Sequence, residues 1–209
     1  MDFSAPPLHP ITAESFAIID QEFGPHQLNP AEYAVIRRVI HTTADFDYRD
    51  RLRFEGGAIA AAQAALIQRC PVVVDVTMVR QGISGLIGQT FGNSIMSAIR
   101  HPAAASASMG SDTTRSARGM AACIAEHPEA IYVVGNAPTA LLTLAEQIHQ
   151  GFARPALVVA APVGFVSVVE SKAAIAQLKV PQIRVEGRKG GSPVAAAIVN
   201  ALVMLACDR

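Results

Sequence analysis

The stretch RRVIHTTADFDY, which begins at Arg37, places one titratable imidazole where a helix-like pattern runs into a turn. Arg37 and Arg38 precede His41 by four and three residues and share its helical face, and Asp45 and Asp47 follow it. The arginines disfavour an imidazolium, whereas the helix end and the aspartates favour it. This balance suits a group that gives and takes a proton near neutral pH. The alternative is that His41 only satisfies the last carbonyls of its helix.

The stretch TTRS, from Thr113 to Ser116, stands just before a second helix-like pattern. Free backbone N–H groups at a helix start and a fork-shaped guanidinium both favour carboxylates. Arg115 and Ser116 are therefore candidates for an anion-binding site that holds a substrate. The alternative is a threonine that caps the helix beside a solvated arginine.

Two other helix starts carry polar groups of the same kind. Asn136, at the end of an apolar run, either caps the next helix or bonds to a ligand. In RKGGSP, Ser192 and Pro193 are expected as the N-cap and first residue of the last helix, and Lys189 is a candidate to bind an anionic substrate. Asp75 is either a hydrogen-bonded residue at a strand end or part of a site.

The sequence lacks the signatures of several cofactor sites. GISGLIGQTFG does not have the GxGxxG spacing of dinucleotide binding, and GRKGGS places its lysine before the glycines, unlike a phosphate-binding loop. GISG is not a nucleophile elbow. The histidines are scattered, without an HExxH motif or a cluster with cysteine, so we expect no metal site. Chemistry without a cofactor is the expectation.

Composition narrows the class of protein. Of 209 residues, 51% are hydrophobic and only 5% are aromatic, so one large aliphatic core is expected. The formal net charge is zero, which argues against a nucleic-acid partner. Three cysteines without CxxC spacing fit a reducing compartment. Because we see neither a secretory signal nor an apolar stretch long enough to span a membrane, we expect a soluble, cytoplasmic protein.

Helical patterns come first along the chain and must position these groups. Thr12 is the expected cap of a helix that Gly24 ends, and Asn29 with Pro30 opens a second helix. A third helix is predicted over 58–68. Later helices are predicted around 116–126, 138–149, 167–178 and 193–206, and the turn Glu170-Ser171-Lys172 is interpreted as solvated.

Short β-branched runs alternate with the later helices. They are VVVDV, SIMSAIR, IYVVGN, ALVVAAP and QIRVEG, which begin at 72, 94, 131, 156 and 182. Runs that are apolar on both faces are typical of parallel strands between helices. We predict one α/β domain over 1–209, a three-layer α/β/α sandwich with a mainly parallel sheet. Its N-terminal part, 1–68, is helical, and 69–209 is doubly wound, with ligands beyond the carboxyl ends of the strands.

Six motifs follow one another from about Ser15 to Leu202: SFAIID, RRVIHTTADFDY, TRSARG, VGNAPTAL, PVGFVSVVESK and GRKGGSPVAAAIVNAL. In this order they resemble the precorrin-8X methylmutase family of cobalamin biosynthesis. Each motif is weakly specific alone, and the set is strongly specific. IHTTADFD and GRKGGS are more similar to the cobalt-precorrin-8 branch than to the aerobic branch. Nothing is carried over between Asn93 and Thr113, where the match is poorer.

The resemblance implies a flavodoxin-like homodimer. It also implies that a methyl group moves from carbon 11 to carbon 12 of the corrin precursor, giving cobyrinate or hydrogenobyrinate. Such a 1,5-sigmatropic shift uses the substrate's own conjugated ring, so no cofactor is needed, and any cobalt belongs to the substrate. The acid/base histidine of the family corresponds to His41, two substrate-contacting positions correspond to Ser15 and Arg38, and the arginine of the TRS motif corresponds to Arg115.

Two other functions stay open. One is a cofactor-independent isomerase or lyase that uses the same histidine on a smaller carboxylate. The other is a tetrapyrrole carrier without catalytic activity. All three interpretations give the chain a small-molecule partner, with no role for nucleic acid or membrane.

Overall fold

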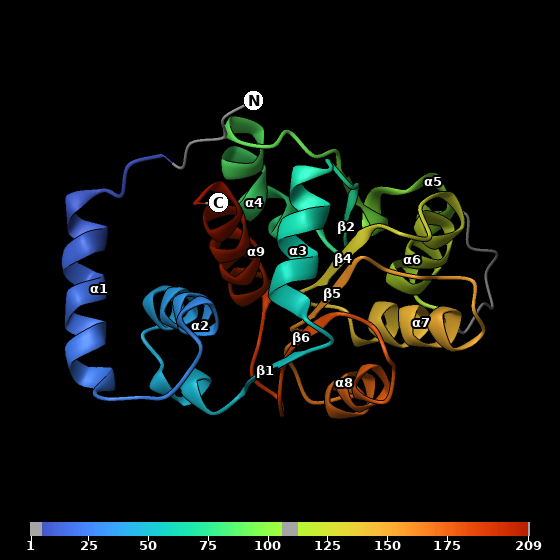
Figure 1. Ribbon diagram of the computed structural model, residues 1–209. Coiled ribbons are helices and arrows are strands. Elements are labelled where there is room, and N and C mark those ends of the chain that lie inside the picture. Colours follow the sequence, from blue (N-terminus) through green and yellow to red (C-terminus); the bar gives the residue numbers. More distant parts are fainter. Residues whose placement is uncertain (1–5, 106–112, 209) are drawn as a thin grey trace.

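The computed structural model describes residues 6–105 and 113–208, which form a central sheet with helices on both faces (Figure 1). In this part of the chain the sheet has six strands in the order β1-β6-β5-β4-β2-β3. Only β1 is antiparallel, to β6. The strands are β1 Leu52–Glu55, β2 Val72–Val74, β3 Ile95–Ser97, β4 Ile131–Val134, β5 Leu157–Ala160 and β6 Gln182–Val185. The predicted sandwich with a mainly parallel sheet is confirmed.

The parallel strands follow the flavodoxin-like order. When they are counted from β2, the sheet runs 2-1-3-4-5, and β1 extends it beyond the last strand. Val72, Val73 and Val74 are all fully buried, because helices cover both faces of the sheet. Val72 and Val74 pack in one apolar cluster, and Val73 packs in a second cluster on the opposite face.

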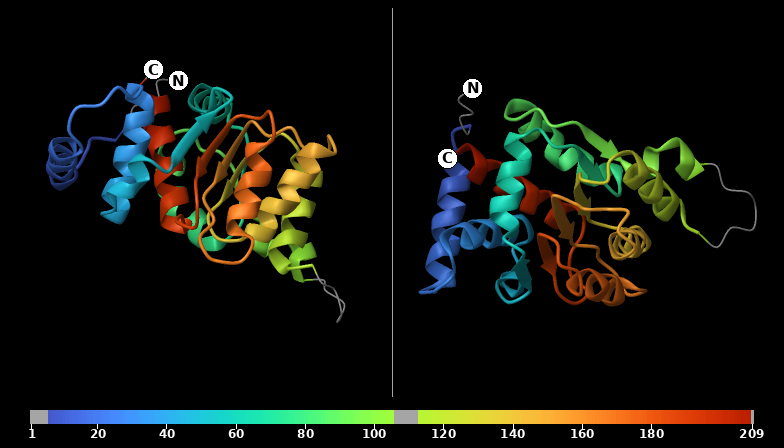
Figure 2. Two further views of the ribbon diagram at one scale, coloured as in Figure 1. Left: turned by 90° about the horizontal axis from the view of Figure 1, so that it is seen from below. Right: turned by 45° about the vertical axis from the view of Figure 1, so that its right-hand side comes forward.

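Two helical layers enclose the sheet (Figure 2). One layer packs around the last helix and the other around α7. The first contains α2 Pro30–Thr43, α3 Ala58–Ile67, α4 Thr77–Gln89 and α9 Ser192–Cys207, and the second contains α6 Arg115–Glu126, α7 Pro138–His149 and α8 Val168–Ala176. The short elements are η1 Phe46–Arg49, η2 Ala98–Arg100 and α5 Pro102–Ala105. All predicted helices and strands are present, with ends that differ by a few residues.

The sequence did not predict β1, α4 or the short elements η1, η2 and α5. β1 lies within the part of the chain interpreted as helical, because LRFE is short and charged and becomes a strand only by pairing with β6. α4 contains three glycines, which disfavour a helix in the sequence. Gly82 is required by packing, since a Cβ there would lie 2.8 Å from the Cβ of Ala196 on α9. Close contact between α4 and α9 therefore outweighs weak helix propensity.

Helix α1, Pro10–Phe23, stands at the edge of the molecule beyond α2 (Figures 1 and 2). Gly24 ends it as predicted, with a φ of 68°. The predicted cap was wrong, because His9 caps the helix and its Nδ1 accepts from the Ile11 N–H at 3.3 Å. Asn29 caps α2 as predicted. At α9 the N-cap is Gly191, and Ser192 is already the first helical residue.

No helix in the described ranges, 6–105 and 113–208, has the length and apolarity needed to cross a membrane.

Candidate active site

His41 lies in the last turn of α2, and its side chain opens into a cavity between α1 and α2. The cavity has a volume of about 350 Å³. Its lining residues come from both helices and from the turn that follows α2: Ser15, Ile18, Ile19, Glu22, Ile40, His41, Ala44 and Phe46. The structure thus brings two of the predicted site residues, Ser15 and His41, into one pocket.

The end of α2 is closed without help from His41. Thr42 and Thr43 each donate a hydroxyl hydrogen bond of 2.9 Å, to the carbonyls of Arg38 and Val39. The Ala44 N–H donates to the Ile40 carbonyl at 2.7 Å, and Ala44 adopts a left-handed conformation that ends the helix. Within residues 6–105 and 113–208, no hydrogen bond joins the His41 ring to a carbonyl of this helix, so the helix-end interpretation does not account for the histidine.

The imidazole of His41 is exposed and packs edge-to-face against Phe16, with ring centroids 5.3 Å apart. Within the described residues this ring contact is the partner found for it, and no hydrogen bond to it is present. Both ring nitrogens are therefore available to a ligand in the cavity. Sequence reasoning missed Phe16, although it stands next to Ser15 in the SFAIID motif.

The two arginines of α2 have different environments. Arg37 lies over the Phe16 ring, 4.4 Å from its centroid, and pairs with Asp20 at 2.9 Å. Arg38 is half-buried, and burial, followed by repulsion from Arg37, lowers the pKa of its guanidinium. It does not line the His41 cavity. Because the charge of Arg37 is already paired with Asp20, its electrostatic effect on His41 is weaker than the sequence predicted.

Lys189 is paired with two carboxylates of the same chain. Its Nζ lies 2.5 Å from Asp45 and 2.8 Å from Asp47, the two aspartates that follow His41 in the sequence. Hydrogen bonds to Lys189 lower the pKa of Asp47, and hydrogen bonds to the aspartates raise the pKa of Lys189. The pair joins the end of α2 to the glycine-rich loop after β6. Substrate binding by Lys189 stays a prediction, and both carboxylates expected to act on His41 are paired with this lysine.

The interpretation of Glu170-Ser171-Lys172 as a solvated turn was wrong, because two of its three residues are buried. Ser171 is fully buried and Lys172 is 4% exposed. The Lys172 Nζ donates to the carbonyls of Gly187 and Lys189, both at 2.8 Å. Val168, Lys172 and Ile175 have the i, i+4, i+7 spacing of a buried helical face, so the sequence carried a signal for this burial.

Asn136 is exposed, and it is not the cap of α7, so the capping interpretation was wrong. Asp75 takes that role across the sheet. Its carboxylate accepts hydrogen bonds of 2.7–3.0 Å from the N–H groups of Gly135, Asn136 and Ala137. Burial raises the pKa of Asp75, and these N–H groups oppose the rise. Of the two interpretations of Asp75, the structure supports the one in which it is a hydrogen-bonded residue at a strand end.

Arg115 and Ser116 open α6, as predicted. Thr114 is the cap, and its Oγ1 accepts from the Ala117 N–H at 3.2 Å. A 2.7 Å hydrogen bond joins the hydroxyls of Thr114 and Thr139, which ties the start of α6 to that of α7. Arg115 is exposed beside these helix starts. This group lies at the carboxyl ends of the strands, in the layer opposite α2, and it does not line the His41 cavity (Figure 1).

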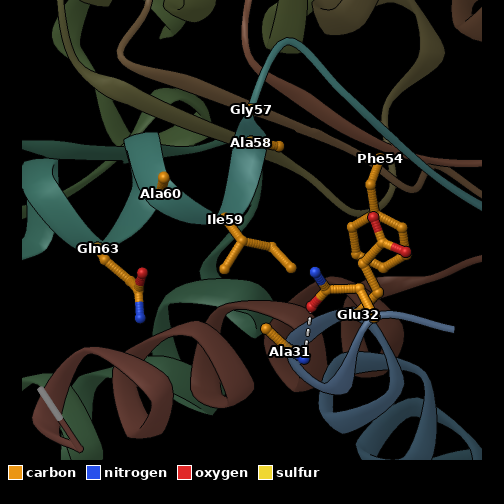
Figure 3. A pocket seen from close by; sticks show the side chains of 9 residues that line it. Ala31, Glu32, Phe54, Gly57, Ala58, Ile59, Ala60 and Gln63 are labelled. Atoms are coloured by element: carbon orange, nitrogen blue, oxygen red, sulfur yellow. Dashed lines mark hydrogen bonds between the residues drawn. The ribbon is translucent and has the colours of Figure 1, made fainter.

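A second cavity, also of about 350 Å³, lies between the N-terminal ends of α2 and α3 (Figure 3). Phe54, Ile59 and Gln63 line it, and Glu32 is its charged side chain. A carboxylate there disfavours an anionic ligand, and none of the predicted site residues contributes to it. The cavity at His41 is therefore the better candidate.

Comparison with known proteins gives concordant matches. A family profile for precorrin-8X methylmutase matches residues 10–205. The chain is 54% identical over 212 residues to the cobalt-precorrin-8 methylmutase of Synechocystis sp., covering 95% of this chain and 96% of that protein. It is 42% identical over 199 residues to the cobalt-precorrin-8 methylmutase of Salmonella typhimurium, covering 92% and 93%.

A solved structure gives the same result. The crystal structure of a precorrin-8x methyl mutase from Thermus thermophilus matches with a TM-score of 0.87 and 43% identity, covering 96% of this chain and 98% of that one. The match spans both the added N-terminal elements and the parallel sheet. The resemblance found in the six motifs is thereby confirmed. The chain belongs to the precorrin-8X methylmutase family, isomerases of cobalamin biosynthesis that move a methyl group within one molecule.

Proposed function

We propose that the chain moves a methyl group from carbon 11 to carbon 12 of cobalt-precorrin-8 or its metal-free counterpart, with His41 as the acid. The observation that carries this proposal is the exposed imidazole of His41, which shares a cavity with Ser15 and is not used to close its helix. A 54% identical relative named cobalt-precorrin-8 methylmutase favours the cobalt-containing substrate.

In the proposed step, the imidazolium of His41 protonates the macrocycle or donates a hydrogen bond to a ring nitrogen as the methyl group migrates. The conjugated ring supplies the electrons of the 1,5-sigmatropic shift, so the step needs no cofactor, and cobalt, where present, is part of the substrate. The histidine takes the proton back when the product forms. Ser15 lies in the same cavity and would bind the macrocycle or one of its arms.

Substrate recognition in this proposal uses local anion sites, because the chain has no net charge. Arg38 would hold a carboxylate arm near His41. Arg115 and Ser116, at the start of α6, would hold other arms with the free N–H groups of that helix. Asn136 and Lys189 would add polar contacts at the neighbouring strand ends.

The proposal requires a second copy of the chain. A corrin with its carboxylate arms is larger than a cavity of about 350 Å³. Helix α6, which begins at Arg115, lies in the opposite helical layer from α2, which carries His41 (Figure 1). Phe165 and Val166 are 83% and 81% exposed, which provides apolar surface at the carboxyl edge of the sheet. We propose a homodimer in which one copy supplies His41 and the other supplies Arg115 to each site.

Replacement of His41 tests the catalytic role. His41→Ala should lower turnover about 10²- to 10⁴-fold while tetrapyrrole binding persists. His149, an exposed histidine in the last turn of α7, provides the matched control, and His149→Ala should keep full activity. The absorption spectrum of the precursor, followed with substoichiometric protein, reports turnover. Near-normal activity of His41→Ala would refute its role as the acid.

Mixing inactive variants tests the shared site. Dimers formed between His41→Ala and Arg115→Ala chains should regain one intact site, so activity should reappear on mixing. Activity that stays absent would exclude sites that combine the two residues from different copies.

The same assay separates the two other functions. A spectral change that saturates at one equivalent of protein would indicate a carrier. Turnover of a smaller carboxylate, without turnover of the tetrapyrrole, would favour an isomerase or lyase that uses the His41 cavity of one chain.

A further inference from the structure

Lys172 is a buried cation whose partners are uncharged. Its side chain lies on α8 against β6, and the whole residue is only 4% exposed. An ammonium group is costly to bury unless it is hydrogen-bonded. Here two main-chain carbonyls, of Gly187 and Lys189, accept from Nζ at 2.8 Å, and no carboxylate pairs with it among the described residues. Such an arrangement fixes a segment of backbone.

The fixed segment is the loop 187–191, which has few side chains of its own to hold it. Gly187, Gly190 and Gly191 all have positive φ values, of 74°, 150° and 119°. A Cβ at Gly190 would lie 2.4 Å from the Ala161 carbonyl oxygen, so the loop lies directly on the chain after β5. The Gly191 N–H donates to the same oxygen at 2.8 Å. Lys172 ties the other half of the loop, which glycine alone would leave free to move.

The loop in turn holds the segment that follows His41. The side chain of Lys189 bridges Asp45 and Asp47, which both belong to the segment that follows α2. These contacts place the turn after Ala44, the residue that ends α2. The chain of contacts therefore runs from Lys172 through the loop to the helix end that carries His41.

We propose that Lys172 is a positioning residue for His41 and acts through the loop 187–191. The proposal rests on the proposed role of His41 as the acid. Lys172 is buried beneath the loop and does not touch the cavity, so its removal should affect the placement of the imidazole more than substrate binding. The burial also lowers the pKa of Lys172 to about 8, and a neutral amine still has the two N–H donors that the carbonyls need.

Lys172→Met tests the proposal, because methionine has a similar length but no donor. Lys179, exposed just beyond α8, provides the matched control variant Lys179→Met. Hydrogen–deuterium exchange without substrate should show several-fold faster exchange over residues 44–50 in Lys172→Met and no change in Lys179→Met. The kcat should fall about ten-fold while KM stays within about two-fold, since a small displacement of the acid is costly.

A double-mutant cycle sharpens the test. Lys189→Met should loosen the same segment, and the combination with Lys172→Met should cost less than the two separate losses together. Additive losses in kcat would mean that Lys172 does not act through Lys189 and would overturn the proposal. Unchanged exchange over 44–50 together with unchanged kcat in Lys172→Met would overturn it as well.

A replacement variant and a measurement that does not depend on catalysis keep the proposal testable. Should Lys172→Met not fold, Lys172→Gln replaces it, since its amide is one bond shorter and both contacts must lengthen. Values equal to those of Lys179→Met would then refute the proposal. Full activity of His41→Ala beside loosened exchange in Lys172→Met would refute the acid role alone, because exchange is measured without catalysis.

Discussion

The end of α2 that carries His41 is held from two sides, each by partly exposed ion pairs, and only the loop side has a buried charged group as well. The side chains of Lys189, Asp45 and Asp47 are 38%, 30% and 56% exposed, whereas Lys172 is 4% exposed. On the α1 side, Phe16 packs against His41, and Arg37 covers Phe16 while it pairs with Asp20. The side chains of Arg37 and Asp20 are 28% and 43% exposed. On the loop side, the Nζ of Lys172 donates hydrogen bonds to two main-chain carbonyls of the loop 187–191.

This difference predicts different mechanical behaviour on the two sides. Exposed ion pairs contribute little to stability, whereas removing one partner of a buried polar group leaves the other unsatisfied. The main helix contact of α1 is with α2, so it can shift without disturbing the sheet. We therefore expect α1 to move when a large substrate enters, against a loop side that stays fixed.

The largest effect is expected at Asp75. Like Lys172, it is a buried charged residue whose hydrogen-bond partners are backbone groups. Asp75→Ala should lower the free energy of unfolding by about 3 kcal/mol, because several buried backbone N–H groups lose a charged acceptor. Urea unfolding measures the change. Asp50→Ala, at an exposed aspartate, should leave stability within about 0.5 kcal/mol. Equal losses in both variants would remove the distinction between buried and exposed carboxylates.

The next effect concerns pH and Lys172. Burial, followed by repulsion from Arg51, lowers the lysine pKa from 10.5 to about 8. Above pH 8 the folded chain releases this proton before the unfolded chain does, so folding becomes more favourable as pH rises to about 10.5. Compared with Lys172→Met, the wild type should therefore gain stability over this window, by at most about 3 kcal/mol. Below pH 8 the cost of the buried charge is present in full.

Urea unfolding of both proteins at several pH values between neutrality and pH 10.5 measures this difference. A constant difference would show that Lys172 titrates alike in the folded and unfolded chains. It would also remove the contrast drawn between the loop side and the α1 side.

On the α1 side, Phe16→Leu should cost about 1 kcal/mol of stability, since it keeps apolar volume but loses the ring contacts with His41 and Arg37. The nuclear magnetic resonance signals of the His41 ring should shift, because an aromatic neighbour is removed. Phe152→Leu, at a ring that is 66% exposed, is the control and should leave those signals in place. Unshifted His41 signals in Phe16→Leu would contradict the ring contact.

The smallest effect is expected at the exposed pair. Asp20→Asn should change the free energy of unfolding by less than about 1 kcal/mol. It should also lower the pKa of Tyr33, which burial and then the hydrogen bond to Asp20 raise to about 12. Ultraviolet titration of tyrosine follows this change, with Glu14→Gln on the same helix as the control. A stability loss as large as that of Asp75→Ala would show that α1 is held as firmly as the sheet.

Local patterns were sufficient for much of the fold. β-branched runs predicted the parallel strands, because such strands are buried on both faces and need apolar residues throughout. Asn29 and Gly24 marked a helix start and a helix end, since capping and positive φ depend on nearby backbone. β1 could not be predicted in this way, because its charged residues become a strand only beside β6.

The candidate site, like the fold, was predicted from the sequence only in part. The sequence alone determined the family, through six ordered motifs, and marked His41 as the titratable group at a helix end. Only the tertiary structure decided that Lys189 pairs with Asp45, 144 positions away, and that Lys172 is buried beneath the same loop. Helix caps and strand patterns depend on neighbours along the chain, whereas these pairings depend on how separate elements pack. Tertiary packing therefore sets which charges remain available to a substrate.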